Sequence, residues 1–361
     1  MKKKLAIIGT QGLPSKYGGF ETLADQLSRY LIYNFEIIVF CSSKVYDKKI
    51  TNLNGVKLRY VPLSANGFSS ILYDSISLLS SLKYDKILIL GASSGYLLPF
   101  LFLWKNKFVL NCGGVDWRRS KWSLLTKIVI KSLEKLAVRN VGVVVSDNQG
   151  MREYFYREYA IDSILIEYGG DQVENIEATK DDCSKYPFLD DKYAFSVARI
   201  QEDNNIHLIL ESFEAFPKFP LVFVGNWNNS SYGKRLKIRF GSIPNLYLID
   251  AIFDHRELNL LRSNCYIYVH GHSAGGTNPA LVEAMNLRLP VLAYASGFNE
   301  FTTENKAMYF RCTESLLCLL QSINEENLDK VKSDMYEIAK TRYQWRRIAD
   351  EYLKTLNNRY D

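Results

Sequence analysis

Short apolar runs alternate with longer stretches of helical periodicity along the whole chain. The runs at 5–9, 35–41 and 86–91 are rich in Ile, Leu and Val and end at glycine or polar residues, which is typical of buried strands. In the stretches between such runs, apolar residues recur every three or four positions, as in amphipathic helices. The alternation predicts an α/β protein with parallel sheets and crossover helices.

The alternation occurs twice, which predicts two doubly wound domains. In the first half, strands are expected at 5–9, 35–41, 56–62, 86–91, 108–112, 142–147 and 163–171, and helices are expected to begin near Gly19, Ser69, Tyr96, Trp122 and Gln149. In the second half, strands are expected at 193–200, 220–226, 246–252, 265–271, 290–295 and 307–312. Two such domains would face each other across a cleft. Because doubly wound sheets bind ligands outside the carboxyl ends of their strands, the loops that follow strands are the candidate sites.

A change in polarity suggests the domain boundaries. The segment 172–192 is polar and acidic, and we expect it to link a first domain at 1–171 to a second domain at 193–340. The stretch 341–361 is helical, with its apolar positions on one face. A length of 361 residues suits two domains of ordinary size.

Composition excludes several classes of protein. Hydrophobic residues make up 47% of the chain and charged residues 23%, which is enough for full cores and incompatible with disorder. The net charge of +6 is spread widely, which argues against a nucleic-acid partner. The six cysteines form no C-x-x-C pair, as in a reduced cytosolic protein. The apolar run "GYLLPFLFLW" at 95–104 is too short to span a membrane and is expected to be a buried or partly buried helix, with membrane docking as the alternative.

The loop "GTQGLPSKYGGFET" lies between the first predicted strand and the first helix. Glycine-rich loops in this position bind phosphate through backbone N–H groups and the helix dipole. The spacing here is G-x-x-G followed by the pair Gly18–Gly19, and no G-x-G-x-x-G occurs. The next strand ends in Cys41, Ser42 and Ser43, where a dinucleotide-binding domain places a carboxylate for the ribose. The loop therefore disfavours an NAD site.

The most informative loop is "GHSAGGTNPALVEAM". Thr277 or Asn278 is expected to cap a helix that begins at Pro279, because proline is preorganised for the first helical position. Gly275 and Gly276 let backbone amides approach a ligand closely, and the helix N-terminus favours a phosphate. The loop predicts either an anion site or a well-capped surface helix.

Two charged residues accompany this loop. Glu283 lies one turn into the helix, where it would either bind the vicinal hydroxyls of a ribose or be a surface carboxylate. Arg199 lies at the carboxyl end of a strand, where its forked guanidinium would either bind a diphosphate or pair with Glu202 or Asp203.

His270 and His272 flank a single glycine at the end of another predicted strand. We predict no metal site, because the chain has only four histidines, no carboxylate lies at ligand spacing beside this pair, and H-E-x-x-H is absent. His270 is instead expected to bond a substrate or to be a satisfied core histidine.

In the first half, "LNCGGVDWRRSKWS" also follows a strand. Asp116 is placed either to bind a sugar hydroxyl or orient an acceptor, or to be a turn residue beside a solvated charge run. In "VVVSDNQGM", Asp147 and Asn148 follow another strand and are expected to serve as the N-cap of the next helix.

Six segments together resemble the bacterial family 4 glycosyltransferases of GT-B fold, and they look closest to the rhamnosyltransferase-like branch of surface polysaccharide synthesis. These segments are "GTQGLPSKYGGFET", "VSDNQGM", "YGGD", "ARIQEDNNIH", "GHSAGGTNPALVEAM" and "FTTENKAMYF". They keep the family's order over nearly the whole chain. The resemblance implies an acceptor-side Rossmann-like domain at 1–171, a nucleotide-sugar-binding Rossmann-like domain at 193–340, and a C-terminal helix at 341–361 that crosses back to the first domain.

The resemblance also implies donor-binding residues. The family's glycine pair matches Gly18 and Gly19, its strand-end arginine matches Arg199, and its ribose-binding glutamate matches Glu283. The backbone of the helix start would cradle the diphosphate. The remaining donor-side positions are Gly275, Gly276, Thr277, Asn278, Pro279 and Ala280.

Two positions depart from the family pattern. Gly275 stands where the family has a first glutamate, and Asn204 stands where a lysine joins the arginine on the diphosphate. His270, His272 and Asn278 are expected to supply hydrogen bonds in their place.

The implied activity is a retaining, metal-independent transfer of a sugar from a nucleoside diphosphate to an acceptor hydroxyl, with no cofactor. The best match is L-rhamnose from dTDP-rhamnose, and another UDP- or GDP-sugar is the alternative. Fixed donors aimed at the departing diphosphate lower the barrier most. Arg199, Asn278, His270 and Asp116 are the expected catalytic residues. In the family a donor phosphate oxygen takes the acceptor proton, so no dedicated base is required.

The implied acceptor is a lipid diphosphate-linked saccharide in the synthesis of capsule, O-antigen or another surface polysaccharide. We expect a cytoplasmic protein, peripheral on the inner face of the bacterial cell membrane. Neighbouring aromatic and basic side chains suit anionic headgroups or a lipid diphosphate. These side chains are Trp117, Arg118, Arg119, Lys121 and Trp122.

Three other classes of protein are alternatives to a glycosyltransferase. A sugar-nucleotide epimerase would carry more histidine and acidic groups. An NAD-dependent dehydrogenase needs the fingerprint that is absent. An inactive sugar-nucleotide-binding subunit agrees with the departures at Gly275 and Asn204, and turnover by purified protein would distinguish it from an enzyme.

Overall fold

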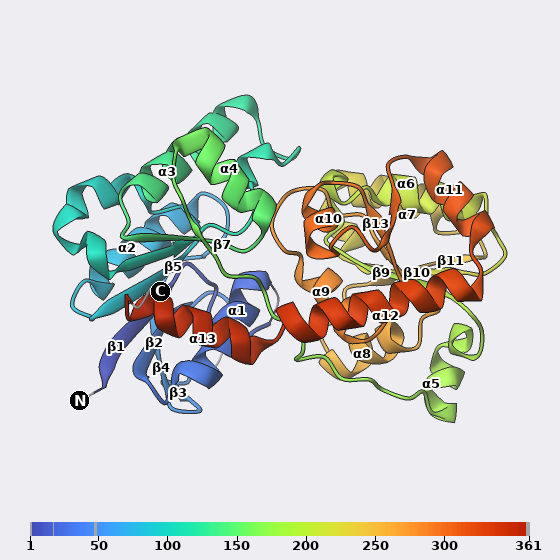
Figure 1. The fold of residues 1–361 in the computed structure, drawn as a ribbon, viewed down its shortest axis with the longest axis horizontal. Coiled ribbons are helices and arrows are strands. Elements are labelled where there is room, and N and C mark those ends of the chain that lie inside the picture. Colours follow the sequence, from blue (N-terminus) through green and yellow to red (C-terminus); the bar gives the residue numbers. More distant parts are fainter. Residues whose placement is uncertain (1, 17, 47–48, 359–361) are drawn as a thin grey trace. The chain divides into compact units, whose positions relative to one another are not determined.

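The computed structural model describes residues 2–16, 18–46 and 49–358, and the chain divides into two compact units (Figure 1). Unit 1 comprises Met1–Arg118, Trp122–Glu167 and Trp345–Asp361. Unit 2 comprises Arg119–Lys121 and Tyr168–Gln344. Each unit is built around one sheet, as the repeated strand pattern predicts.

The described part of unit 1 contains an eight-stranded sheet in the order β3-β4-β2-β1-β5-β6-β7-β8. Its strands are β1 (Lys3–Ile8), β2 (Phe35–Ser42), β3 (Asn52–Leu53), β4 (Val56–Val61), β5 (Lys86–Leu90), β6 (Phe108–Asn111), β7 (Val143–Ser146) and β8 (Ile164–Leu165). The pair β3–β4 is antiparallel and the other pairs are parallel. In the central register, Leu5 of β1 lies opposite Ile37 of β2 and Lys86 of β5. The two-residue strand β3 was not expected from the sequence.

Helices cover both faces of this sheet. They are α1 (Gly19–Leu31), α2 (Ser69–Ser81), the 3-10 helices η1 (Gly95–Lys107) and η2 (Asp116–Arg118), α3 (Leu124–Arg139), α4 (Gln149–Tyr159) and α13 (Trp345–Leu356). From β1 the chain moves toward one edge of the sheet, to β2, and from β4 it moves back toward the other edge, to β5. Because crossovers between parallel strands are right-handed, α1 lies on one face of the sheet, whereas α2, η1 and α3 lie on the other. The last helix, α13, lies beside α1 (Figure 1).

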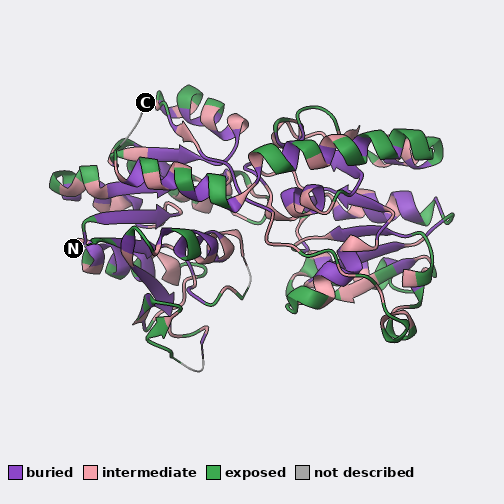
Figure 2. Cartoon of the chain, turned by 60° about the horizontal axis from the view of Figure 1, so that its bottom comes forward, coloured by how far each residue is buried: buried purple, intermediate pink, exposed green. Residues whose placement is uncertain are grey.

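The described part of unit 2 contains a six-stranded parallel sheet in the order β11-β10-β9-β12-β13-β14. Its strands are β9 (Ala194–Val197), β10 (Leu221–Gly225), β11 (Leu246–Asp250), β12 (Ile267–His270), β13 (Val291–Tyr294) and β14 (Met308–Phe310). Figure 2 shows the strands of both sheets as buried, whereas the helices carry exposed residues along their outer sides. Strands buried on both faces explain why the apolar runs are continuous rather than alternating.

The helices of unit 2 lie before, between and after its strands. They are α5 (Lys180–Lys185), η3 (Pro187–Asp190), η4 (Glu202–Asn204), α6 (Ile206–Glu214), η5 (Trp227–Asn229), α7 (Ser231–Phe240), α8 (His255–Ser263), α9 (Pro279–Asn286), α10 (Phe298–Thr302), α11 (Thr313–Ser322) and α12 (Glu325–Arg342). Phe213, Phe223 and Ile267 lie in the apolar core of this unit. The segment 172–192 contains α5 and η3 and belongs to unit 2.

Candidate functional site

The strands β9 and β12 lie side by side in unit 2, at the point where the strand order reverses. From β9 the chain continues to β10 on one side, and from β12 it continues to β13 on the other. Ligands of doubly wound sheets bind at the carboxyl ends of such a strand pair. Arg199 and Asn204 follow β9, and the loop "GHSAGGTN" begins as β12 ends, so most of the predicted donor residues gather at this reversal.

Asn204 joins the two loops. It is buried, and its Nδ2 donates to the backbone carbonyl of Arg199 at 2.6 Å. Its Oδ1 accepts from Nδ1 of His272 at 2.7 Å. Ser273 adds two bonds between the same loops, from its backbone N–H at 3.0 Å and its hydroxyl at 2.8 Å, both to the carbonyl of Asp203. Asn204, which stands where the family has a diphosphate-binding lysine, therefore positions both loops.

A close backbone approach reinforces this junction. A Cβ at Gly271 would lie 2.1 Å from the backbone oxygen of Asn204, so only glycine allows the loops to meet here. Asn205 has φ 49° and donates from Nδ2 to the carbonyl of Gly271 at 2.8 Å. The left-handed conformation is one that asparagine tolerates. The two loops thus form one hydrogen-bonded layer.

His270 is the last residue of β12 and is buried. Its ring stacks on Tyr268 with centroids 6.0 Å apart, and its Nε2 has no hydrogen-bond partner among the described residues. Burial lowers the pKa of His270 to about 3, and His272 adds to that shift. The imidazole is therefore neutral at pH 7. The structure does not support the alternative of a satisfied core histidine, because one ring nitrogen is buried and unbonded.

His272 is neutral for a related reason. Burial, followed by the nearby Arg119 guanidinium, lowers the pKa of His272 to about 4. Its backbone carbonyl accepts a hydrogen bond from Asn299 at 2.8 Å. Arg119 belongs to unit 2 and also lies 3.9 Å from a carboxylate oxygen of Asp203. Arg199 is exposed at the start of the loop after β9.

The helix α9 begins as predicted. Asn278 is the N-cap and its side chain accepts from the backbone N–H of Ala280 at 3.0 Å, while Pro279 is the first helical residue. Gly275 and Gly276 precede it with φ 80° and 74°. Two successive left-handed residues favour glycine, and a glutamate at 275 would be strained there. This backbone conformation gives a physical reason for the departure at Gly275.

Glu283 is held from two sides. Its Oε2 lies 2.7 Å from Nη1 of Arg262, and its Oε1 accepts from Nε2 of Gln172 at 2.7 Å. Arg262, on α8, is only 2% exposed. The alternative of a simple surface carboxylate is therefore wrong. The sequence predicts neither partner of Glu283. Gln172 is 111 residues away along the chain, and Arg262 has the position of an ordinary cation in the last turn of a helix.

The glycine loop of unit 1 is organised by a residue that sequence reasoning missed. Glu21, buried in the first turn of α1, accepts from the backbone N–H of Gln11 at 2.7 Å and from the hydroxyl of Thr10 at 3.1 Å. The backbone N–H of Gln11 is therefore already bonded to a carboxylate of the protein. Gly18 is the N-cap of α1 with φ 130°, and Gly19 begins the helix. Tyr17, which precedes the pair, lies outside the described residues.

The aromatic and basic residues after β6 belong to different units. Arg119 and Lys121 are in unit 2, whereas the other members are in unit 1. Within unit 1, Nε1 of Trp117 donates to the hydroxyl of Tyr154 at 2.7 Å, and the Arg118 guanidinium lies 5.2 Å and 5.4 Å from these two rings. Asp116 begins the short helix η2. Trp117 is thus partly buried and fixed in the fold.

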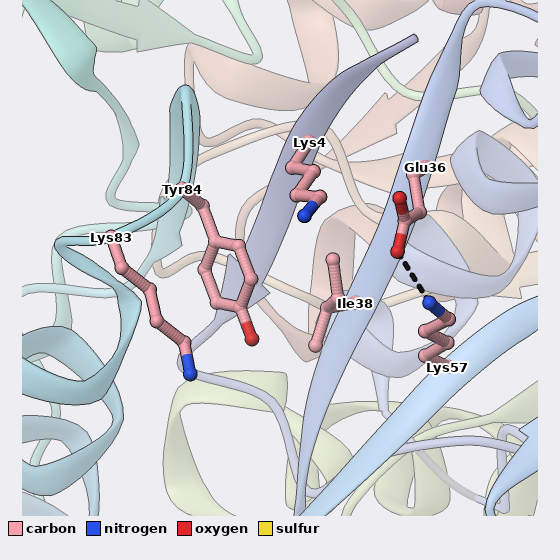
Figure 3. Close-up of a pocket in the computed structure, with 6 residues that line it drawn as sticks. All are labelled: Lys4, Glu36, Ile38, Lys57, Lys83 and Tyr84. Atoms are coloured by element: carbon pink, nitrogen blue, oxygen red, sulfur yellow. Dashed lines mark hydrogen bonds and ion pairs between the residues drawn. The ribbon is translucent and has the colours of Figure 1, made fainter. Parts of the chain in front are cut away.

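A pocket of about 330 Å³ occurs elsewhere in unit 1 (Figure 3). Lys4, Glu36 and Lys57 line it near the amino ends of β1, β2 and β4, together with Ile38, Lys83 and Tyr84. An ion pair joins Glu36 to Lys57. Because this is the edge opposite to the carboxyl-end loops, the pocket is not the candidate site.

The described residues contain no group of three or more His, Cys, Asp or Glu side chains that could hold a metal ion. They also contain no helix both long and apolar enough to cross a bilayer. All six cysteines are free: Cys41, Cys112 and Cys265 are buried, Cys183 is partly buried, and Cys312 and Cys318 are exposed.

Two family matches divide the chain. Residues 2–171 match the family described as "Domain of unknown function (DUF1972)", and residues 179–312 match "Glycosyl transferases group 1". No curated protein matches the chain.

Solved structures share the fold of the whole chain. Sucrose-phosphate synthase from Thermosynechococcus elongatus is 17% identical with a TM-score of 0.83, and the match covers 99% of each chain. Anabaena HepE, in complex with UDP and glucose, is 14% identical with a TM-score of 0.74, covering 99% of this chain and 100% of HepE. Trehalose 6-phosphate synthase from Burkholderia multivorans is 11% identical with a TM-score of 0.72, covering 99% of both chains. Residues 179–312 therefore match the glycosyl transferases group 1 family, and the whole chain has the two-domain GT-B fold that these solved structures share.

Proposed function

We propose that unit 2 binds a nucleoside-diphosphate sugar at the loops that follow β9 and β12, and that the enzyme transfers the sugar with retention and without a metal. The observation that carries the proposal is the joining of these two loops at the strand-order reversal by Asn204 and Gly271. A fixed pair of loops can hold a diphosphate in one position relative to the reacting carbon.

Each part of the donor has a proposed partner. The Arg199 guanidinium and the N-terminus of α9 stabilise the charge that builds on the departing diphosphate. The glycine turn at Gly275 and Gly276 lets the chain approach the phosphates closely. Glu283, oriented by Arg262 and Gln172, binds the ribose hydroxyls.

The neutral His270 offers its unpaired Nε2 to the sugar. Asn278 acts mainly by capping α9. The family resemblance supports roles for Gly18 and Gly19 beside the diphosphate and for Asp116 at the acceptor, and these roles stay predictions. The transferred group is a hexose-type sugar.

We propose L-rhamnose from dTDP-rhamnose as the donor, on the family resemblance and on the chemistry at Gly275. Glycine at that position leaves one carboxylate fewer to bind sugar hydroxyls, and a 6-deoxy sugar presents one hydroxyl fewer. The competing donor is a UDP-sugar, because HepE, which shares the fold, is described in complex with UDP and glucose. The proposed acceptor is a lipid diphosphate-linked saccharide of surface polysaccharide synthesis, at the cytoplasmic face of the membrane.

Steady turnover by the purified protein tests the proposal. Release of nucleoside diphosphate and formation of a glycosylated lipid would be followed with dTDP-rhamnose, UDP-glucose and GDP-mannose, each with a lipid diphosphate-linked acceptor. We expect transfer from one of the three, and an anomeric configuration in the product that matches the donor. Tight donor binding with no transfer from any donor would instead identify an inactive sugar-nucleotide-binding subunit.

A further inference from the structure

The helical layer formed by α2, η1 and α3 has an unusual outer side. Of the 20 large hydrophobic residues that are exposed in the described part of the chain, 12 lie on these three elements or at the N-cap of α2. Four lie in unit 2, at well-separated positions in the sequence. Monomeric proteins rarely gather exposed apolar side chains in this way unless the surface is used.

The helix α3 reverses the usual amphipathic arrangement. Leu125 is 77% exposed, and Ile128 and Val129 are exposed on the same side, whereas Glu134 is only 3% exposed. The hydroxyls of Tyr154 and Tyr159 both donate to Glu134, which offsets the cost of burying its carboxylate. These inward hydrogen bonds fix the rotation of α3 about its own axis. The apolar stripe formed by Leu125, Ile128 and Val129 therefore faces outward.

The neighbouring elements extend this apolar side. Phe100, Phe102 and Leu103 of η1 are at least 65% exposed. A Cβ at Gly95 of η1 would lie 2.1 Å from the backbone oxygen of Leu133 in α3, which shows how closely these two elements approach. The segment 95–104, predicted to be a buried or partly buried helix, is partly buried: Leu98 and Leu101 are buried, whereas these three side chains are exposed.

The helix α2 completes the layer. Leu72, Ile76 and Leu79 are exposed at helical spacing. The hydroxyls of Ser75 in α2 and Tyr96 in η1 lie 2.8 Å apart, which joins these two elements. The three elements share one face of the sheet of unit 1, opposite α1 and α13 (Figure 1).

Charge distinguishes between the surfaces that could cover this layer. The helix α3 carries Lys127, Lys131, Lys135 and Arg139, and its single acidic residue is the buried Glu134. The lysines recur every four positions beside the apolar stripe, and Lys131 among them pairs with Glu158 at 2.9 Å. A second copy of the chain docked through the same face would bring like charges together, which is unfavourable. An anionic lipid surface offers apolar tails to the stripe and phosphates to the lysines.

We propose that the outer side of α2, η1 and α3 inserts into the interfacial region of a bilayer that contains anionic lipid. The inference rests on the proposed function in one respect: a lipid-linked acceptor would be met at the same surface. It differs from the prediction for the aromatic and basic residues around Trp117, because the contact is made by exposed aliphatic and phenylalanine side chains on these three elements. It extends to α2 and α3 the membrane-docking alternative given above for 95–104. The residues around Trp117 are not required for it.

Co-sedimentation with vesicles tests this surface. The full chain is mixed with vesicles of phosphatidylcholine alone or of phosphatidylcholine with phosphatidylglycerol. We expect binding mainly to the mixed vesicles, weakened by added salt. In the double variant Leu125→Ser/Ile128→Ser, binding falls at least tenfold. The matched control is Ile238→Ser in α7, because Ile238 is 83% exposed but lies in unit 2, and its binding should equal that of the unaltered protein.

The lysine row gives an independent test. Lys127→Ala/Lys135→Ala lowers binding to mixed vesicles and removes most of its salt dependence. Equal vesicle binding by the Leu125→Ser/Ile128→Ser variant and the unaltered protein would overturn the proposal. A dimer in sedimentation velocity that this variant dissociates would also overturn it, by assigning the face to a second copy.

Donor binding separates this inference from the proposed function. Thermal stabilisation by nucleoside diphosphate should be the same in the unaltered protein and in the Leu125→Ser/Ile128→Ser variant. Vesicle binding without any nucleotide response would count against the proposed function alone. A nucleotide response without vesicle binding would count against the membrane surface alone.

Discussion

The two units share a doubly wound plan but differ in the charge at the reversal of their strand order. In unit 1, where β1 and β5 are neighbours, the buried carboxylate of Glu21 bonds a backbone amide of the glycine loop. In unit 2, where β9 and β12 are neighbours, Arg199 and the N-terminus of α9 lie at the loops instead. In the first arrangement a carboxylate takes a backbone N–H that could otherwise bind a phosphate, whereas the second arrangement attracts an anionic ligand. The difference explains why a glycine-rich loop alone does not identify a phosphate site.

The units also differ in their exposed apolar side chains. Both units bury polar groups, such as Glu21 and Glu134 in unit 1 and Asn204 and His270 in unit 2. Among the described residues, exposed apolar side chains gather on one helical layer of unit 1. Buried polar groups and exposed apolar groups both cost stability unless something bonds or covers them. We interpret the buried, unbonded Nε2 of His270 as part of a site for a polar ligand, and the apolar layer of unit 1 as a site for an apolar surface.

The largest expected effect comes from breaking the buried pair in unit 2. Glu283→Ala leaves the Arg262 guanidinium, 2% exposed, without its carboxylate, so the free energy of unfolding should fall by about 3 kcal/mol in a urea titration. The control is Glu351→Ala, which removes the surface partner of Arg347 and should cost less than about 1 kcal/mol. Equal losses in the two variants would show that the buried pair has no special role.

The next effect comes from separating the two loops. Asn204→Ala removes the hydrogen bonds to the Arg199 carbonyl and to His272, so the free energy of unfolding should fall by about 2 kcal/mol, at about 1 kcal/mol for each bond. Donor affinity should fall with it, because the loops lose their fixed spacing. If Asn204→Ala leaves both stability and nucleotide binding unchanged, Asn204 does not position the loops.

Removing the cation at the reversal should act on catalysis rather than on folding. Arg199→Ala should lower turnover at least tenfold, which corresponds to about 1.4 kcal/mol of transition-state stabilisation. Its unfolding midpoint should stay close to that of the unaltered protein, because Arg199 is exposed. Lys340→Ala, an exposed cation on α12, is the matched control. Full turnover by Arg199→Ala would exclude the proposed role.

The smallest effect is a pH dependence in unit 2. The folded protein keeps His270 neutral down to a pKa of about 3, whereas the unfolded chain takes up the proton near the ordinary value of 6.5. The unfolded state therefore binds more protons as the pH falls below 6.5, and stability is lost in the window from 6.5 towards 3. Between pH 6 and pH 5, the unaltered protein should lose about 1 kcal/mol more than His270→Phe. Parallel stability curves for the two proteins would contradict a buried, neutral His270.

Much of the fold could be predicted because each buried parallel strand appears in the sequence as a short, continuous apolar run. Apart from the two-residue β3, each described strand coincides with a predicted apolar run, although β1 begins two residues earlier and β2 ends one residue later. The cap at Asn278 was predictable for the same reason, since N-cap and Pro at the first turn are local chemistry. The run 95–104 was harder, because a nearly uniform apolar sequence does not reveal which side faces the core.

The partners within the site could not be predicted, because they come from distant parts of the chain. Gln172 and Arg262 bond Glu283 from two other elements, and neither lies in a motif. From the family pattern, Asn204 indicates only the loss of a lysine's positive charge. Its hydrogen bonds to both loops are visible only in the structure. Glu21 gave one local signal, an acid in the first turn of a helix, but not its bond back to the glycine loop.

The most direct test of the central claim is calorimetric titration of dTDP, UDP, GDP and NAD into the unaltered protein and Arg199→Ala. The account predicts that at least one nucleoside diphosphate binds the unaltered protein, that Arg199→Ala binds it at least tenfold more weakly, and that Lys340→Ala binds it unchanged. Binding of NAD with no heat from any of the three nucleoside diphosphates would contradict a donor site at the loops after β9 and β12.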